Sequence, residues 1–132
     1  MLQNHAIKFL ECAFRTDRQE ILHQPDGYGK MSIECGDTLE LFLVIKDKRI
    51  AHIAYATNGC MNTTACVNAA IDLAQGQSLS RASAITPQEV AEYLQTLPQE
   101  HFHCAELAVE ALKAALADAR RTLQAPWKKS YR

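Results

Sequence analysis

Several features that would assign a class of protein at once are missing from this sequence. No apolar run approaches the roughly 20 residues that a helix needs to cross a bilayer, and the first residues lack the basic and apolar regions of a secretory signal. The formal net charge is only −1, so no excess of basic residues favours a nucleic-acid partner or an anionic membrane. We therefore expect a soluble protein of the cytoplasm.

The cysteine pattern excludes further classes. Five cysteines are an odd number, so they cannot all form disulfides, and a reducing cytoplasm would keep them as thiols. The sequence has no Cys-x-x-Cys pair of the zinc-finger type, and it also lacks the motifs of zinc deaminases. The cysteines are therefore expected to bind a metal or to react in some other arrangement.

What is present is the composition of one folded domain. The chain of 132 residues is 48% hydrophobic and 22% charged, which is ordinary for a globular protein. We find no repeat, low-complexity segment or linker in it. A single domain over residues 1–132 is therefore expected.

Three stretches of different periodicity predict the order of the elements. An amphipathic helix is expected within residues 1–22, a sheet within 30–57 and a helical part within 61–124. The sheet would be small and antiparallel with about three strands, since two apolar runs flank the polar turn 47–49 and a shorter run precedes them. With helices packed on one face of the sheet, the expected fold class is α+β.

Capping residues mark the helices of the second half. A helix after Cys60 is expected to end at Gly76, and Thr86-Pro87-Gln88-Glu89 has the features of a capping box. The last helix is expected over residues 102–124, with an alanine-rich apolar stripe along it.

The side chains that could bind a metal are gathered in three short stretches, Cys35-Gly36-Asp37, Gly59-Cys60 and His103-Cys104. Side chains two apart in an extended chain point to one face, so Cys35 and Asp37 could address the same metal ion. Cys60 and Cys104 lie where helices should begin, and the helix dipole there is expected to lower the pKa of both thiols. Three thiolates with a carboxylate or an imidazole are a suitable ligand set for zinc or for an iron–sulfur cluster. A carboxylate binds iron more weakly than a thiolate does, so a cluster at such a site would be bound less firmly than at a site of four cysteines.

Other reactive side chains are expected to be structural or exposed. Cys12 and Cys66 lie on predicted helices and should be small core residues, and His101 is expected to be exposed. A thiol enzyme with Cys104 as nucleophile and His103 as base is disfavoured, because adjacent side chains on a helix diverge by about 100°.

The three stretches and their separations resemble the iron–sulfur cluster assembly scaffolds of the IscU and NifU N-terminal type. The resemblance runs from about Gly29 to Ala119. Its matching segments are Cys35-Gly36-Asp37-Thr38-Leu39-Glu40-Leu41, Asn58-Gly59-Cys60, Leu97-Pro98 and His103-Cys104-Ala105. It implies a carrier protein, not an enzyme, on which a transient [2Fe-2S] cluster is assembled and passed to apo iron–sulfur proteins.

The resemblance also implies roles for single residues. Cys35, Asp37, Cys60 and Cys104 match the family's ligands, and His103 matches an imidazole that can substitute among them. Cys104 further matches the thiol that accepts persulfide sulfur from a cysteine desulfurase. Members of the family also bind zinc at the same residues.

One segment departs from the family pattern. Residues 97–101 are Leu-Pro-Gln-Glu-His, where housekeeping scaffolds have Leu-Pro-Pro-Val-Lys as the recognition site of an Hsp70-type chaperone. This difference leaves the chaperone partnership in doubt and indicates a divergent, NifU-like scaffold. Two alternatives on the same fold stay open, a zinc-dependent sulfur acceptor of the SufU type and an interaction protein that has lost cluster assembly.

Overall fold

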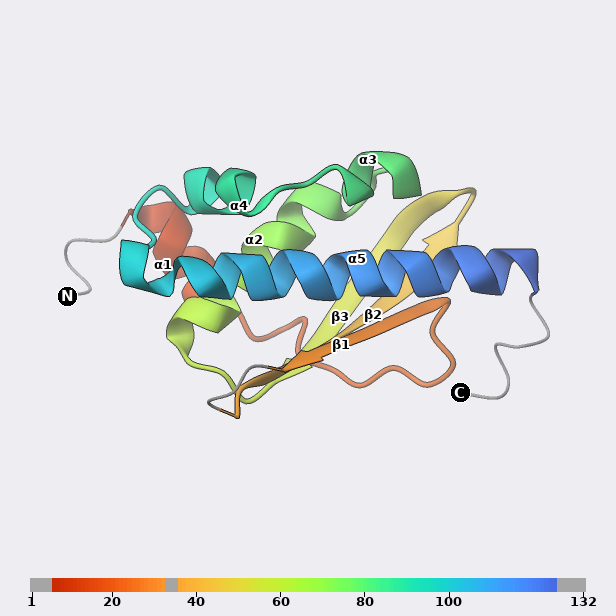
Figure 1. Cartoon of the computed structure of the whole chain (residues 1–132), viewed down its shortest axis with the longest axis horizontal. Coiled ribbons are helices and arrows are strands. Elements are labelled where there is room, and N and C mark those ends of the chain that lie inside the picture. The colour runs from red at the N-terminus through yellow and green to blue at the C-terminus, as the bar shows by residue number, and fades with distance from the viewer. Residues whose placement is uncertain (1–5, 33–35, 126–132) are drawn as a thin grey trace.

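A three-stranded antiparallel sheet forms one layer of the computed structural model, which describes residues 6–32 and 36–125 (Figure 1). The strands are β1 (Gly27–Ser32), β2 (Thr38–Lys46) and β3 (Arg49–Thr57), and β2 is the central one. The predicted sheet and its two longer strands are confirmed. The short first strand begins earlier than expected, and part of its predicted span, residues 33 and 34, lies outside the described residues.

Helices supply the other layer, and the expected α+β class is confirmed. The helices are α1 (Ile7–Ala13), α2 (Met61–Ala74), α3 (Leu79–Ser83), α4 (Pro87–Leu94) and α5 (Phe102–Gln124), with a 3-10 turn η2 (Gln99–His101) before α5. The long helix α5 lies across β1 and β2, α2 packs beside α5, and α1 and α4 pack against α2 (Figure 1). None of the described helices is both long enough and apolar enough to cross a membrane.

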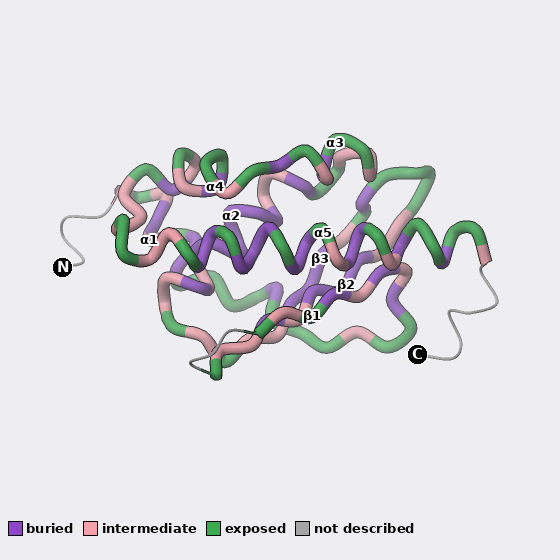
Figure 2. The backbone as a smooth tube through the Cα atoms, in the orientation of Figure 1, coloured by how far each residue is buried: buried purple, intermediate pink, exposed green. Residues whose placement is uncertain are grey.

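The alternation of side chains along β2 sets the inner face of the sheet. Leu39, Leu41 and Leu43 are at most 1% exposed, because every second residue of a strand points to the helices. The corresponding face of α5 is a buried stripe along the helix, which Figure 2 shows as purple segments at regular intervals. The predicted alanine-rich stripe of the last helix is therefore confirmed as part of the core.

Glycines in β1 allow α5 to lie unusually close to the sheet. A Cβ atom added at Gly29 would lie 2.5 Å from the carbonyl oxygen of Ala111 and 2.5 Å from the backbone nitrogen of Ala115. A Cβ atom at Gly27 would lie 2.5 Å from the carbonyl oxygen of Ala115. Small residues on both sides thus permit contact between the two backbones, which holds the middle of α5 close to the sheet.

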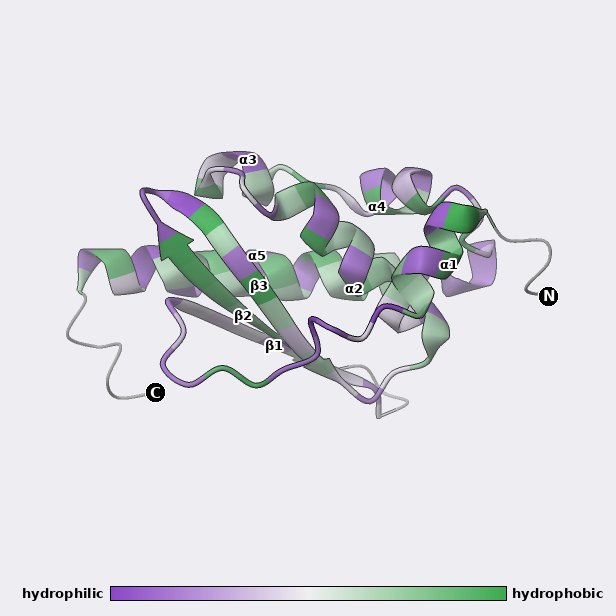
Figure 3. Cartoon of the chain, turned by 180° about the vertical axis from the view of Figure 1, so that it is seen from behind, coloured by the Kyte–Doolittle hydropathy of each residue, from purple (hydrophilic) through white to green (hydrophobic). Residues whose placement is uncertain are grey.

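The N-terminal helix is shorter than the sequence predicted. The helix α1 ends at Ala13, and residues 14–26 form a loop that runs in front of the sheet when the molecule is seen from behind (Figure 3). Phe14 and Ile21, whose spacing suggested a longer helix, are 59% and 64% exposed. The prediction failed because apolar spacing alone does not ensure burial. The short helix α3 was not predicted.

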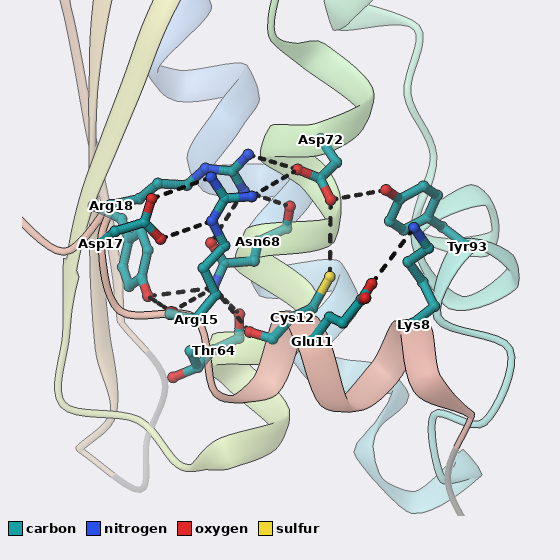
Figure 4. A network of polar contacts seen from close by, with 11 residues as sticks. Lys8, Glu11, Cys12, Arg15, Asp17, Arg18, Thr64, Asn68, Asp72 and Tyr93 are labelled. Atoms are coloured by element: carbon teal, nitrogen blue, oxygen red, sulfur yellow. Dashed lines mark hydrogen bonds and ion pairs between the residues drawn. The ribbon is translucent and has the colours of Figure 1, made fainter.

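Polar contacts fix this loop to α2 instead (Figure 4). The side-chain amide of the fully buried Asn68 donates hydrogen bonds to the carbonyl oxygens of Cys12 (2.9 Å) and Arg15 (3.0 Å). The buried guanidinium of Arg18 donates to Asp72 at 2.6 Å. Groups on one face of α2 therefore satisfy backbone oxygens that the short α1 helix leaves without helical partners.

Candidate metal and sulfur site

The site lies where α2 and α5 begin. Cys60 is the N-cap residue of α2 and is exposed, whereas Cys104 is the third residue of α5 and is only 2% exposed. Between them lies the buried hydroxyl of Thr63, which donates to the Cys104 sulfur at 3.5 Å and lies 4.0 Å from the Cys60 sulfur. One hydroxyl therefore contacts both thiols.

The position of Thr63 depends on the glycine that precedes Cys60. A Cβ atom added at Gly59 would lie 2.8 Å from the Cβ, Cγ2 and Oγ1 atoms of Thr63. A larger residue at Gly59 would push the threonine away from the sulfurs. The Gly59-Cys60 pair is thus required locally by the packing of the first turn of α2.

A second polar contact joins the Asp37 segment to the Cys60 segment. The side-chain oxygen of Asn58 accepts a hydrogen bond from the backbone N–H of Thr38 at 2.7 Å, and its amide donates to the carbonyl oxygen of Gly36 at 3.3 Å. Asp37 lies between these two contacts and is half-buried. Asn58 therefore keeps the carboxylate segment beside the start of α2.

The thiol of Cys60 behaves as the sequence predicted. Burial raises its pKa, but the backbone N–H groups of Thr63 and Asn62 outweigh burial, so the pKa is lower than that of an ordinary cysteine. Both N–H groups belong to the first turn of α2, where the helix N-terminus favours a negative charge. Exposure and a lowered pKa together favour the thiolate of Cys60.

The expectation of a lowered pKa is wrong for Cys104. Burial raises the pKa of this thiol above its ordinary value, and the hydroxyl of Thr63, which lowers it, does not compensate. The neighbouring Cys60 and the charge of Asp37 raise the pKa further. The sequence located Cys104 near a helix start but could not reveal that the thiol points into the core.

His101 lies in this site, although the sequence predicted an exposed side chain. Ligand atoms of Cys60, His101 and Cys104 all lie within 4.8 Å of one another. The Nδ1 atom of His101 is buried and has no hydrogen-bond partner among the described residues. Two thiols and an imidazole form a donor set that suits zinc or iron, so the side chains present fit a metal of this kind.

His103 is an exposed neighbour of Cys104. Its Nε2 atom lies 3.7 Å from the Cys104 sulfur, so the expected divergence of adjacent helical side chains does not keep the pair apart. The ring nitrogen of His103 therefore reaches the thiol although the two residues are adjacent on α5. His103 is not part of the three-donor group formed by the described residues.

The structure brings some of the predicted ligands close together, and one of them lies outside the described residues. Cys60 and Cys104 are brought together, His103 contacts Cys104, and Asp37 is close enough for its charge to raise the pKa of Cys104. Cys35 lies outside the described residues.

The two remaining cysteines are core residues, as predicted. Cys12 is 2% exposed and Cys66 is fully buried. Burial raises the pKa of Cys12 to about 11 and also raises the pKa of Cys66. All four cysteines within the described residues are free thiols. Cys12 and Cys66 are therefore inert under conditions where Cys60 reacts.

The sequence interpretation gave no role of their own to Asn58 and Thr63, and it expected His101 to be exposed. Thr63 follows Cys60 by three residues, and His101 precedes Cys104 by three, which is the spacing of neighbours on a helical turn. That spacing was the available indication for both. For Asn58 the only indication was its place next to Gly59-Cys60.

An α+β domain that gathers thiols and imidazoles at the starts of two helices has the donor groups to bind a metal ion. A sequence profile described as the NifU-like N terminal domain matches residues 16–125. The chain therefore belongs to the NifU-like N-terminal domain family.

Relatives and a solved structure agree with this assignment. The chain is 36% identical over 98 residues to the iron–sulfur cluster assembly scaffold protein IscU 1 of Archaeoglobus fulgidus, covering 74% of this chain and 64% of that protein. It is 38% identical over 85 residues to the scaffold protein IscU of Escherichia coli, covering 64% and 66%. These matches span slightly less than two thirds of each relative.

The fold is also that of a solved family member. The N-terminal NifU-like protein of Brucella abortus superimposes with a TM-score of 0.69 at 16% identity, over 88% of this chain and 94% of the other. At that identity the likeness bears on the fold alone.

Proposed function

We propose that this protein is an iron–sulfur cluster assembly scaffold, which receives sulfur, builds a labile [2Fe-2S] cluster and passes it to apo-proteins. The observation that carries the proposal is the pair of free thiols, Cys60 and Cys104, held at one hydroxyl at two helix starts. Relatives at 36% and 38% identity are named as such scaffolds, which adds independent support. The protein would act as a carrier and not as an enzyme.

The cluster, as cargo, would be bound by thiolates and a carboxylate. We assign Cys35, Asp37, Cys60 and Cys104 as its ligands, with His103 able to substitute. Thiolates bind iron more strongly than a carboxylate does, so the Asp37 ligand would be the one that weakens the site. Weak binding suits a protein that must release its cargo.

Sulfur acceptance would take place at Cys104. The Cys104 thiolate attacks the outer sulfur of a desulfurase persulfide, forming a new S–S bond and breaking the old one, and the desulfurase thiolate leaves and takes up a proton. Because the pKa of Cys104 is raised, its proton must first be removed, and the His103 ring nitrogen at 3.7 Å is placed to accept it. Each transferred sulfur then needs two electrons to become sulfide, which an external dithiol would supply.

A second candidate function uses the same site without a cluster. The Cys60, His101 and Cys104 group is a suitable set for a single zinc ion, which favours a zinc-dependent sulfur acceptor of the SufU type. In both cases a cysteine desulfurase is the proposed donor. The four free thiols suit a reducing compartment such as the cytoplasm. The Hsp70-type chaperone is not part of the proposal.

Anaerobic reconstitution tests the scaffold function. The protein is incubated with ferrous iron, cysteine, a dithiol and a cysteine desulfurase, and then mixed with an apo-ferredoxin. We expect the visible absorption of a [2Fe-2S] cluster on this protein, followed by its appearance on the ferredoxin. Failure to form a cluster, with one zinc retained per chain, would favour the zinc acceptor.

The role of Asp37 provides a separate prediction. The variant Asp37→Ala lacks the carboxylate, which is the weakest of the proposed cluster ligands. We expect this variant to transfer its cluster to the apo-ferredoxin severalfold more slowly, because the weak ligand is no longer there to promote release of the cluster. Asp47→Ala, in the exposed turn between β2 and β3, is the matched control and should transfer at the wild-type rate. Faster cluster loss from Asp37→Ala would contradict the assigned role.

A further inference from the structure

Among the described residues, His101 is the histidine that lies with Cys60 and Cys104 in a group of metal donors. The family resemblance matches His103 and not His101. We propose that His101 is a metal ligand of this protein and that, together with Cys60 and Cys104, it binds a single zinc-type ion. The inference deepens the proposed function and rests on it, because it uses two of the same thiols. It assigns a ligand role to His101, a residue that is not among those matched to the family's ligands.

The distances between the donors support this assignment. A tetrahedral ion with Zn–S bonds of about 2.3 Å and Zn–N bonds of about 2.0 Å spaces its ligands roughly 3.5–3.8 Å apart. The donor atoms of Cys60, His101 and Cys104 lie within 4.8 Å of one another. Side-chain rotations that shorten these distances by about 1 Å would therefore complete three corners of a tetrahedron.

The local backbone explains why these three donors meet. His101 ends the 3-10 turn η2, and Cys104 lies one turn later on α5, so both side chains lie on the same side of the chain. Cys60 enters from the start of α2, which packs against α5. Two rigid elements thus supply the three donors, which favours a defined geometry.

An independent observation concerns the unsatisfied ring of His101. Its Nδ1 atom is buried, yet no described residue forms a hydrogen bond with it. Buried polar atoms in folded proteins nearly always have a partner, and those that lack one call for an explanation. Coordination of an ion, with rotation of the ring where needed, would provide that partner.

His103 differs from His101 in both exposure and reach. It is exposed, and its Nε2 atom lies 3.7 Å from the sulfur of Cys104 on the same helix. The centroids of the two imidazole rings are 6.0 Å apart. Replacing one histidine at a time therefore tests the contribution of each ring to metal binding. The fourth corner of the tetrahedron stays available to a carboxylate, a thiolate or an incoming sulfur donor.

Cobalt(II) serves as a spectroscopic probe of this site, because its visible absorption reports both thiolate ligation and tetrahedral geometry. Metal-free wild type, His101→Gln and His103→Gln are titrated with cobalt(II) under anaerobic conditions, and zinc affinity is then measured by competition. His52→Gln, on β3, is the control. Circular dichroism and thermal unfolding without metal verify that each variant is folded.

We expect His101→Gln to lose at least about tenfold in zinc affinity, more than His103→Gln loses, and to shift the cobalt bands, while His52→Gln stays within about threefold of wild type. Equal affinities for wild type and His101→Gln would overturn the inference. So would a loss confined to His103→Gln.

The same variants separate this inference from the proposed function. If wild type assembles a cluster but His101→Gln binds zinc normally, the ligand assignment fails and the scaffold function stands. If zinc affinity depends on His101 but wild type builds no cluster under reconstitution, the scaffold function fails and the ligand assignment stands.

Discussion

At the scale of single residues, the hydroxyl of Thr63 connects the two thiols of the site. It is 1% exposed, and it donates to the Cys104 sulfur while lying close to that of Cys60. Since this hydroxyl lowers the pKa of Cys104, its removal should leave the thiol harder to ionise. Thr63 is therefore a positioning residue for the less reactive of the two cysteines.

Replacing Thr63 by valine keeps the shape but removes the donor. We expect Thr63→Val to slow alkylation of Cys104 by roughly threefold to tenfold at pH 8, because a weak hydrogen bond to the thiolate contributes about 1 kcal/mol. Thr63→Ser retains the hydroxyl and should react more like wild type. Peptide mapping by mass spectrometry after timed exposure to iodoacetamide measures the rates. Identical Cys104 rates in all three proteins would contradict the contact.

The two thiols themselves should differ in reactivity. In metal-free protein at pH 7.5, Cys60 should be alkylated at least about ten times faster than Cys104, since each unit of pKa changes the thiolate fraction about tenfold. The lowered pKa of Cys60 places the midpoint of its pH–rate profile below that of free cysteine, and the raised pKa of Cys104 places its midpoint above. The buried Cys12 and Cys66 serve as internal controls that stay unmodified. Faster labelling of Cys104 would refute this order.

Sequence reasoning reached part of the site at this scale. Cys60 and Cys104 could be located because turn and capping residues mark the starts of their helices. The environment of Cys104 could not be inferred, since its burial depends on contacts with α2 that are remote in sequence. His101 was misjudged for the same reason, because its partners Cys60 and Cys104 are brought to it by the packing of two helices.

At the scale of elements, the contact between β1 and α5 holds the middle of α5 close to the sheet. The alanine stripe of α5 was evident from its period. The residues of β1 that it packs against, Gly27 and Gly29, could not be recognised in the same way, because glycines do not contribute to a pattern of hydrophobic residues. Gly27 and Gly29 each leave space that a backbone atom of α5 occupies at 2.5 Å from the position of an added Cβ. The long N-terminal helix was mispredicted because the polar groups that hold residues 14–18 lie on α2.

A methyl group at Gly29 would test this contact. We expect Gly29→Ala to reduce the free energy of unfolding by about 1–3 kcal/mol, because α5 must move away from β1. Urea denaturation followed by circular dichroism measures the change. Lys30→Ala, at the neighbouring exposed position of the same strand, is the matched control and should change stability by less than about 0.5 kcal/mol. Equal midpoints for the two variants would exclude close packing at Gly29.

At the scale of the whole molecule, Asn68 and Arg18 join the N-terminal segment to the helical layer. The side-chain amide of Asn68 donates its two N–H groups to the carbonyl oxygens of Cys12 and Arg15, and its neighbour Asp72 accepts from Arg18 (Figure 4). A single cluster of buried residues also runs through α1, the sheet and the helices. We therefore propose that the described residues unfold together as one domain.

Truncating Asn68 would leave the carbonyl oxygens of Cys12 and Arg15 without this donor. We expect Asn68→Ala to lower the free energy of unfolding by about 2–4 kcal/mol, measured by urea denaturation. Gln88→Ala, an exposed amide on α4, provides the control and should be close to wild type. Loss of the N-terminal segment alone, seen as two separate transitions, would argue against one cooperative domain.

The central claim is that one site, built on Cys60 and Cys104, assembles an iron–sulfur cluster. The most direct measurement is the iron and acid-labile sulfide content of wild type, Cys60→Ser, Cys104→Ser and Cys66→Ala after anaerobic reconstitution and gel filtration. We predict two iron and two sulfide per cluster in wild type and in Cys66→Ala, and loss of most of both in the two serine variants. Full cluster content in Cys60→Ser and Cys104→Ser, or none in wild type, would contradict the account.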